Sequence, residues 1–114
     1  MTEFLAVYGT IRQGDGNDVF VDGCPFVGMF WIPYFKMGSF GTFPVAIPSN
    51  DPNDQILTEI YKIHSLEPTD RLEGYPRFYN RKLVLFDGNR KAWIYYQSNP
   101  NVNHYISSGD WFQG

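Results

Sequence analysis

The stretch RKLVLFDGNRKAWIYY, residues 81–96, carries the clearest fold signal in the chain. Two runs of apolar and aromatic residues, at 81–86 and 91–96, flank the tripeptide Asp87-Gly88-Asn89. An Asp-Gly pair between two such runs is typical of the tight turn of a β-hairpin. The stretch therefore predicts two antiparallel strands joined by a turn at 87–89.

Three segments outside this hairpin predict further strands. Phe4–Tyr8 is a short apolar run ended by Gly9, which is typical of a buried strand that leads into a loop. Phe26–Met37 is rich in aromatic residues and long enough for one bent strand, with Pro33 at a bulge or on a sheet edge. Gln55–Ile63 shows an imperfect alternation of apolar and polar residues, which favours another strand.

Few segments favour a helix. Glu67–Leu72 has a proline near its start, acidic residues early and Gly74 to end it, which predicts one or two helical turns. Gly41–Asn53 carries three prolines and predicts an ordered loop. Asn99–Gly114 is polar, but its large apolar residues favour a packed segment over a disordered one. The sequence thus predicts an α+β fold, a small mixed β-barrel or strongly curled sheet with a few short helices.

Composition and charge limit the classes of partner. The length of 114 residues suits a single domain, residues 1–114. The net charge of −3 argues against electrostatic binding of nucleic acid or anionic lipid. No apolar run approaches a membrane span, the start lacks the features of a signal peptide, and the lone Cys24 excludes an internal disulfide. We expect a soluble, cytoplasmic protein with a small-molecule partner.

The aromatic residues leave a second interpretation open, because a small barrel can stack the bases of single-stranded nucleic acid on exposed rings. No interleaved run of Lys and Arg accompanies these residues, so the hydrophobic core is the favoured role for them. The residues concerned are Phe26, Phe30, Trp31, Tyr34, Phe35, Tyr95 and Tyr96.

Several kinds of site lack their usual sequence pattern. His64 and His104 lie far apart and no cluster has the spacing of metal ligands, so we expect no metal site. Neither a Gly-x-Ser-x-Gly elbow nor an activated-cysteine motif occurs, which argues against an enzymic nucleophile. The glycine-rich loop at 9–14 lacks the endings of phosphate-binding and dinucleotide-binding loops.

Glu73 is the best candidate for catalysis. It directly precedes Gly74 at the end of the predicted helix, where the helix dipole disfavours the carboxylate anion and should raise its pKa, as partial burial would also do. The glycine-rich turn that begins at Tyr8 could offer backbone N–H groups to an anionic or carbonyl oxygen of a ligand. A glutamate beside a turn is nevertheless most often a solvated surface group, so local features alone give this hypothesis little weight.

A set of motifs occurs along nearly the whole chain in one order. They are Val7-Tyr8-Gly9-Thr10-Ile11-Arg12-x-Gly14 with Asn17, Phe43-Pro44-Val45-Ala46-Ile47-Pro48, Glu59-Ile60-Tyr61, Asp70-Arg71-Leu72-Glu73-Gly74-Tyr75-Pro76, Tyr79-x-Arg81, Ala92-Trp93-Ile94-Tyr95-Tyr96 and Ser108-Gly109-Asp110-Trp111. With them the chain resembles the gamma-glutamylcyclotransferase-like family, in particular its branch of gamma-glutamylamine cyclotransferase and AIG2-like proteins. Thr58 and Ile11 depart from the common Gly and Leu of that family.

The resemblance implies an intramolecular aminoacyl transfer that needs no cofactor. A gamma-glutamyl amine or peptide cyclises to pyroglutamate and releases the free amine, with Glu73 as general acid and base. The nucleophile is the substrate's own α-amine, so no enzymic Ser or Cys is required. The resemblance also implies substrate-binding roles for Tyr8, Gly9, Thr10, Ile11 and Tyr79.

Three questions stay open at this point. The same fold could serve as a binding or regulatory module without turnover. The leaving amine is not specified, although the cavity mouth, in the stretch 39–53 and the polar tail, is expected to select it. No long exposed apolar helix demands a dimer, so a monomer is favoured over an oligomer.

Overall fold

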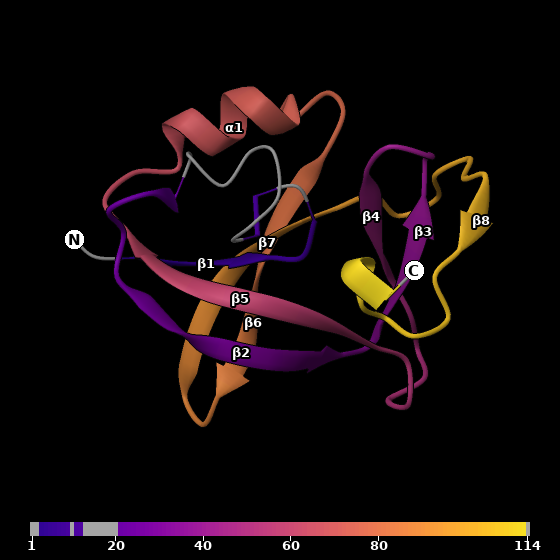
Figure 1. The fold of residues 1–114 in the computed structure, drawn as a ribbon, viewed down its shortest axis with the longest axis horizontal. Helices are drawn as coiled ribbons and strands as arrows, with labels where there is room; N and C mark the ends of the chain where they lie inside the picture. Colours follow the sequence, from indigo (N-terminus) through magenta and orange to yellow (C-terminus); the bar gives the residue numbers. More distant parts are fainter. Residues whose placement is uncertain (1–2, 10, 13–20, 114) are drawn as a thin grey trace.

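The computed structural model describes residues 3–9, 11–12 and 21–113. Within these residues, a mixed sheet of eight strands carries a single α-helix (Figure 1). The predicted α+β class is therefore confirmed. The elements are β1 Glu3–Val7, β2 Phe26–Pro33, β3 Phe35–Ser39, β4 Pro44–Pro48, β5 Gln55–Ile63, α1 Glu67–Glu73, β6 Asn80–Asp87, β7 Arg90–Tyr96, β8 His104–Tyr105 and the short 3₁₀ helix η2 Trp111–Gln113.

The sheet is strongly curled but not closed. Its strands follow the order β2-β5-β1-β7-β4-β3-β8, and β6 pairs with β7 outside this path. Curling brings the Phe86 ring of β6 to 5.3 Å from Phe4 of β1 and 5.2 Å from Phe30 of β2, between ring centroids. Because β2 and β8, at the ends of the strand order, do not pair, the sheet does not form a closed barrel. Of the two predicted architectures, the strongly curled sheet is therefore the one observed.

The hairpin of residues 81–96 is confirmed as β6 and β7. Arg81 pairs with Tyr95 and Leu83 with Trp93, and the turn falls at Gly88 and Asn89. Since β6 runs along all of β7, the parallel partners β1 and β4 share the other edge of β7. β1 pairs with Trp93 and Ile94 and β4 pairs with Tyr96, so the two strands follow one another along this edge and separate beside β7.

The predicted single bent strand at Phe26–Met37 is wrong, because the chain breaks into β2 and β3 at Tyr34. Tyr34 has a positive φ of 69°. Its N–H donates a hydrogen bond of 2.8 Å to the Asp54 carbonyl, and its carbonyl accepts one of 2.8 Å from the Ser49 N–H. These bonds turn the chain away from the β2 direction. The expectation for Pro33 is confirmed, because β2 is an edge strand.

The prediction of a loop at Gly41–Asn53 is also wrong in part, because residues Pro44–Pro48 form β4. Pro44 and Pro48 are the first and last residues of this strand, where a missing N–H is tolerated. Val45 and Ala46 between them are fully buried and pair with β3. Two of the three prolines therefore bracket a core strand rather than exclude one.

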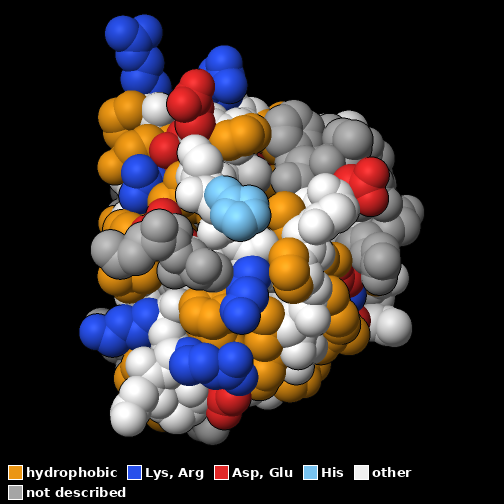
Figure 2. All heavy atoms as spheres, turned by 90° about the vertical axis from the view of Figure 1, so that its left-hand side faces the viewer, with side chains coloured by type: hydrophobic (Ala, Val, Ile, Leu, Met, Phe, Trp, Pro, Cys, Tyr) orange, Lys and Arg blue, Asp and Glu red, His pale blue; other side chains and the backbone are white. Residues whose placement is uncertain are grey.

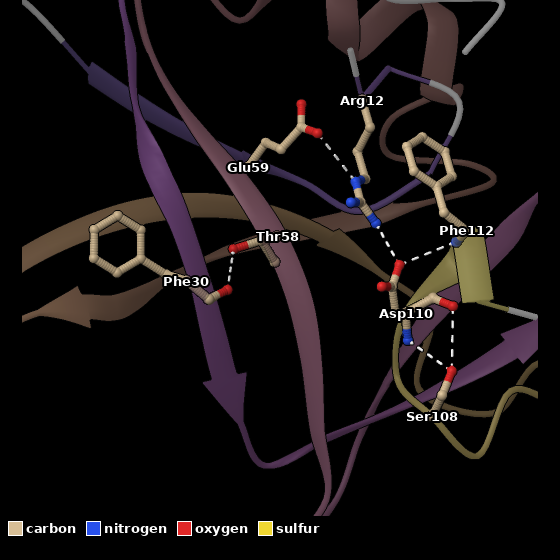
Figure 3. A network of polar contacts seen from close by, with 7 residues as sticks. All are labelled: Arg12, Phe30, Thr58, Glu59, Ser108, Asp110 and Phe112. Carbon is tan, nitrogen blue, oxygen red and sulfur yellow. Dashed lines mark hydrogen bonds and ion pairs between the residues drawn. The ribbon is translucent and has the colours of Figure 1, made fainter. Parts of the chain in front are cut away.

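The core lies between the curled faces of the sheet. Thr58, which replaces the family's usual glycine, is fully buried and donates a hydrogen bond of 2.7 Å to the Phe30 carbonyl (Figure 3). A core role is wrong for Phe26, Trp31 and Tyr34, whose side chains are exposed. The largest fully buried side chains include Phe35, Leu5, Ile32, Met37, Ile56, Ile60 and Ile94.

The helix and the C-terminal segment largely follow the predictions. α1 ends at Gly74, whose left-handed φ of 65° closes the helix as expected. The tail packs through buried Ile106, and the Gly109 carbonyl accepts a hydrogen bond of 2.8 Å from Leu57 of β5, while Tyr105 is exposed. Within the described ranges, no helix is long and apolar enough to cross a membrane.

Candidate functional site

A cavity of about 340 Å³ opens where β1 and β4 separate and where α1 ends. Such a volume suits a small molecule. The cavity lies among segments that are far apart in the sequence. Its lining residues are Ala6, Val7, Tyr8, Gly9, Ile11, Thr42, Phe43, Pro44, Leu72, Glu73, Phe78, Tyr79 and Tyr95.

Tyr8 fills the space between the separating strands. Its buried hydroxyl donates a hydrogen bond of 2.6 Å to the Tyr95 carbonyl of β7 and accepts one of 3.1 Å from the Ala46 N–H of β4. The hydroxyl thus satisfies two backbone groups at the point where β1 leaves the ladder. This arrangement fixes the floor of the cavity.

Glu73 is the last residue of α1 and lines the cavity, as we expected for a site residue. The turn after the helix holds its backbone. The Glu73 carbonyl accepts a hydrogen bond of 3.3 Å from the Tyr79 N–H, and the Gly74 carbonyl accepts one of 2.8 Å from the Phe78 N–H. Among the residues that the structure describes, the Glu73 carboxylate takes part in no hydrogen bond or ion pair. A partly buried acid without a protein partner is available to a ligand.

Burial raises the pKa of Glu73 from 4.5 to about 7. The direction is the expected one, and of the two expected causes it is desolvation of the carboxylate, rather than the helix dipole, that raises the pKa. Burial, followed by the charge of Glu73, also raises the pKa of Tyr79, and burial with the charges of Tyr79 and Glu73 raises that of Tyr8. Glu73 is therefore close to both tyrosines, and at neutral pH it is present in both protonation states.

The loop after β1 packs tightly against β4. A Cβ atom on Gly9 would lie only 2.5 Å from the Pro44 ring, so this position requires glycine. The Arg12 N–H donates to the Gly9 carbonyl at 2.9 Å, and buried Ile11 lines the cavity. The fourth loop residue expected at the site, Thr10, lies outside the described residues.

Arg12 anchors this loop instead of adding charge to the cavity. Its guanidinium is buried, donates to Glu59 at 3.2 Å and to Asp110 at 2.7 Å, and lies 4.1 Å from the centre of the Phe112 ring (Figure 3). Asp110 is held in turn by the hydroxyl of Ser108 (Figure 3). The observed role of Arg12 is thus a structural ion pair.

A second network fixes α1 on β6 and β7. Asp70 accepts hydrogen bonds from Arg81 at 2.9 and 3.3 Å and from the Tyr95 hydroxyl at 2.7 Å. The Tyr95 hydroxyl also lies 2.8 Å from the Thr69 hydroxyl. Because α1 ends in Glu73, this network sets the position of the Glu73 carboxylate relative to the cavity.

The structure brings together Glu73, Tyr8, Gly9, Ile11 and Tyr79, all of which were predicted as site residues. The Tyr79 hydroxyl donates a hydrogen bond of 2.7 Å to the Pro44 carbonyl. Tyr79 therefore forms a wall of the cavity and connects the turn that follows α1 to β4. Thr42, Phe43 and Pro44 lie in the stretch 39–53 that was expected at the cavity mouth, whereas none of the lining residues comes from the tail. Sequence reasoning did not single out the remaining lining residues as site residues, which are Ala6, Val7, Leu72, Phe78 and Tyr95.

Charged groups form no obvious binding centre elsewhere. Among the described residues, no cluster of three or more His, Cys, Asp or Glu is placed to hold a metal ion. On the face that Figure 2 shows, Lys and Arg side chains are scattered among hydrophobic and acidic ones. The cavity beside Glu73 is therefore the strongest candidate site.

A curled open sheet with a partly buried carboxylate at the end of a short helix defines a small α+β fold with a candidate site in its cavity. The chain belongs to the family described as gamma-glutamyl cyclotransferase, AIG2-like, which matches residues 5–113. The resemblance inferred from the motifs is thus confirmed.

Individual relatives are similar over nearly their whole length. The gamma-glutamylcyclotransferase family protein YtfP of Escherichia coli K12 is 32% identical over 110 residues, 94% of each chain. A Pyrococcus horikoshii protein superposes with a TM-score of 0.80 at 24% identity, over 97% of this chain and 91% of that one. An AIG2-like protein from Mus musculus superposes with a TM-score of 0.78 at 19% identity, over 96% of this chain and 88% of that one. The last two likenesses concern the fold alone.

Proposed function

We propose that this protein is a gamma-glutamyl cyclotransferase that converts a gamma-glutamyl amine or peptide to pyroglutamate and the free amine. The observation that carries the proposal is the carboxylate of Glu73, which has no partner among the described residues. It has a pKa of about 7 and lines the cavity of a chain from a family described by this activity. A group with this pKa accepts and donates protons at neutral pH with similar ease.

The reaction uses Glu73 twice. The free α-amine of the substrate attacks the γ-carbonyl carbon, forming the new C–N bond of the ring, and the Glu73 carboxylate accepts the proton lost by that nitrogen. The resulting carboxylic acid then donates this proton to the leaving nitrogen as the old amide C–N bond breaks. Glu73 returns to its starting state, and no water or cofactor is consumed.

The loop after β1 would hold the glutamyl end of the substrate. Tyr8, Gly9 and Ile11 line the cavity, and Arg12 and Pro44 hold this loop in place. Backbone N–H groups of such a preorganised loop, including that of Thr10, would bind the α-carboxylate or the developing oxyanion without a charged side chain. Tyr79 forms the adjoining wall and supports the turn that carries Glu73.

The experiment compares the parent protein with Glu73→Gln on a panel of gamma-glutamyl amines, gamma-glutamyl dipeptides and glutathione. Released pyroglutamate is quantified by mass spectrometry. Glu67→Gln is the matched control, because Glu67 lies on the same helix with an exposed side chain that pairs with exposed Arg71 at 3.3 Å. The proposal expects release by the parent and the control and a large loss in Glu73→Gln.

Failure of the folded parent to release pyroglutamate from any conjugate would contradict the proposal. Binding of a conjugate without turnover would then favour the alternative, a binding or regulatory module on the same fold. The cytoplasmic location, the monomeric state and the absence of a nucleic-acid partner stay predictions from the sequence.

A further inference from the structure

A buried cluster of charged side chains lies outside the cavity and contacts the loop after β1. The guanidinium of Arg12, on that loop, pairs with Glu59 of β5 at 3.2 Å and with Asp110 near the C-terminus at 2.7 Å (Figure 3). None of these three residues lines the cavity, whereas Gly9 and Ile11 of the same loop do. The loop therefore contributes to the cavity through Gly9 and Ile11 and is attached to the rest of the fold through Arg12.

The position of Arg12 is coupled to the backbone that faces the cavity. The Arg12 N–H donates a hydrogen bond of 2.9 Å to the Gly9 carbonyl, which closes a turn between the two residues. Gly9 in turn packs against Pro44, where an added Cβ atom would lie 2.5 Å from the ring. The loop is thus fixed at two points, and a shift of Arg12 moves the backbone at Gly9.

Asp110 is held firmly enough to serve as an anchor. Its Oδ1 atom accepts the hydrogen bond from Arg12 and a second one of 3.0 Å from the Phe112 N–H. The neighbouring Gly109 carbonyl accepts a hydrogen bond of 2.8 Å from the Leu57 N–H, which fastens this segment to β5. The Phe112 ring covers the guanidinium at 4.1 Å. A short, charge-assisted hydrogen bond between buried groups is one of the stronger polar contacts in a protein.

The anchor of the loop is separate from the contacts that position Glu73. Asp70, Arg81 and the Tyr95 hydroxyl fix α1, and this set has no residue in common with the Arg12 cluster. The raised pKa of Glu73 has burial as its cause. A change at Asp110 should therefore disturb the loop and leave the acid and its titration in place.

The C-terminal segment consequently acts on the cavity without lining it. Resting on the proposed function, we propose that Asp110 is a positioning residue for the reaction, because through Arg12 it sets the place of the loop that holds the glutamyl end of the substrate. Every gamma-glutamyl conjugate shares this end. A displaced loop should therefore impair all conjugates by the same factor, whatever amine they carry.

The first test is Asp110→Asn, which keeps the size of the side chain and removes its charge. Among the described residues, Arg12 is then left with Glu59 as its one ion-pair partner. Thr58→Val is the matched control, because Thr58 is also fully buried, loses one hydrogen bond of 2.7 Å and does not line the cavity. Both proteins are assayed by kcat/KM for pyroglutamate release, with denaturation curves to show that they are folded.

The substrates are gamma-glutamyl-phenethylamine and the panel conjugate of a different amine that the parent turns over fastest. We expect Asp110→Asn to lower kcat/KM by about 10–100-fold for both conjugates, because a small misplacement of a binding group is costly. The pH at which Glu73 titrates in the kcat profile should stay that of the parent. A loss no larger than that of Thr58→Val, a loss with one conjugate alone, or a moved titration would overturn the inference.

A milder variant tests the same contact if the buried change prevents folding. Phe112 is 47% exposed, so Phe112→Leu removes the ring from the guanidinium at little risk to the core. We expect kcat/KM to fall by about two- to fivefold, the worth of one exposed cation–π contact. Tyr105→Leu, with an exposed ring in the same tail, should match the parent. Equal values in the two variants would overturn the inference.

A double-mutant cycle separates positioning from a general loss of stability. Arg12→Lys keeps the charge but loses the planar group that reaches both carboxylates. In the Arg12→Lys protein, Asp110→Asn should lower kcat/KM by a much smaller factor than in the parent, since the two residues act through one contact. Equal factors in the two backgrounds would overturn the inference.

Failure of the inference is distinguishable from failure of the proposed function. A parent that turns over a conjugate supports the function whatever Asp110→Asn does. If the parent binds gamma-glutamyl-phenethylamine without turnover, the proposed function fails, and the inference is then read from calorimetric Kd values. We expect Asp110→Asn to weaken this binding by about tenfold or more. An unchanged Kd would overturn the inference, and a parent that neither binds nor turns over any conjugate would overturn both.

Discussion

The hydroxyl of Tyr8 donates a hydrogen bond of 2.6 Å to the carbonyl of Tyr95, a residue 87 positions further along the chain. The same hydroxyl accepts a hydrogen bond of 3.1 Å from the Ala46 N–H. This side chain thereby joins β7 to β4 where β1 diverges from them, and it builds the floor of the cavity. The first motif of the chain therefore has a structural role as well as a place in the candidate site.

Tyr8→Phe should destabilise the fold by about 1–3 kcal/mol, because it leaves the Ala46 N–H and the Tyr95 carbonyl without their buried partner. Urea denaturation measures the change in free energy of unfolding. Tyr34→Phe is the matched control, since the Tyr34 ring is half exposed. Equal stabilities for the two variants would contradict the bridging role of Tyr8.

Gly9→Ala should cost about 1–3 kcal/mol and lower activity, because the added methyl group collides with the Pro44 ring. The double variant with Pro44→Ala removes the ring atoms that lie 2.5 and 2.7 Å from the added carbon. A double-mutant cycle followed by denaturation should therefore show that Pro44→Ala recovers some of the loss. Strictly additive effects would argue against direct contact.

The raised pKa of Glu73 makes stability depend on pH. The native state holds its proton up to about pH 7, whereas the unfolded chain releases it near 4.5. Between these values the native state binds more protons, so the free energy of unfolding decreases as pH rises. The shift corresponds to at most about 3 kcal/mol, an upper limit because Glu73 is partly exposed.

Glu73→Gln removes this dependence and should therefore be more stable than the parent at pH 8, by about 1–3 kcal/mol. The difference should shrink as pH falls through 7 and become small near pH 4.5. Denaturation of both proteins across this range measures it. A difference that does not vary with pH would contradict the raised pKa.

Asp70→Asn should lower kcat by about 10–100-fold, because a loosened α1 misplaces Glu73 relative to the substrate. The pH at which Glu73 titrates in the kcat profile should change little, since Asp70 acts on position. Glu67→Gln, on the exposed side of the same helix, should leave kcat unchanged. Unchanged kcat in a folded Asp70→Asn protein would rule out a positioning role.

Local patterns were sufficient to predict much of the fold. The hairpin at 81–96 and the end of α1 at Gly74 were found because their turn residues lie beside clear strand and helix patterns. β4 was missed because its prolines look like loop residues until their place at the strand ends is known. The break at Tyr34 depends on hydrogen bonds to Ser49 and Asp54, which no local pattern reveals.

The candidate site was predicted mainly where a motif named its residues, and the stretch 39–53 expected at its mouth supplies Thr42, Phe43 and Pro44. Glu73 and the loop after β1 belong to the two most specific motifs. Tyr95 and Phe78 reach the cavity through strand pairing and ring packing across long sequence separations. The burial that raises the pKa of Glu73 is likewise a property of the folded cavity, so the sequence could indicate the direction and two causes, burial and the helix end, but not which of them acts.

The most direct test of the account is the rate of pyroglutamate release from gamma-glutamyl-phenethylamine by the parent and by Glu73→Gln, side by side at pH 7. Denaturation curves confirm that both proteins are folded. We predict a loss of about 10²–10⁴-fold in Glu73→Gln, the usual contribution of a general acid and base. Release at the parent rate by the folded variant would contradict the role of Glu73 in catalysis.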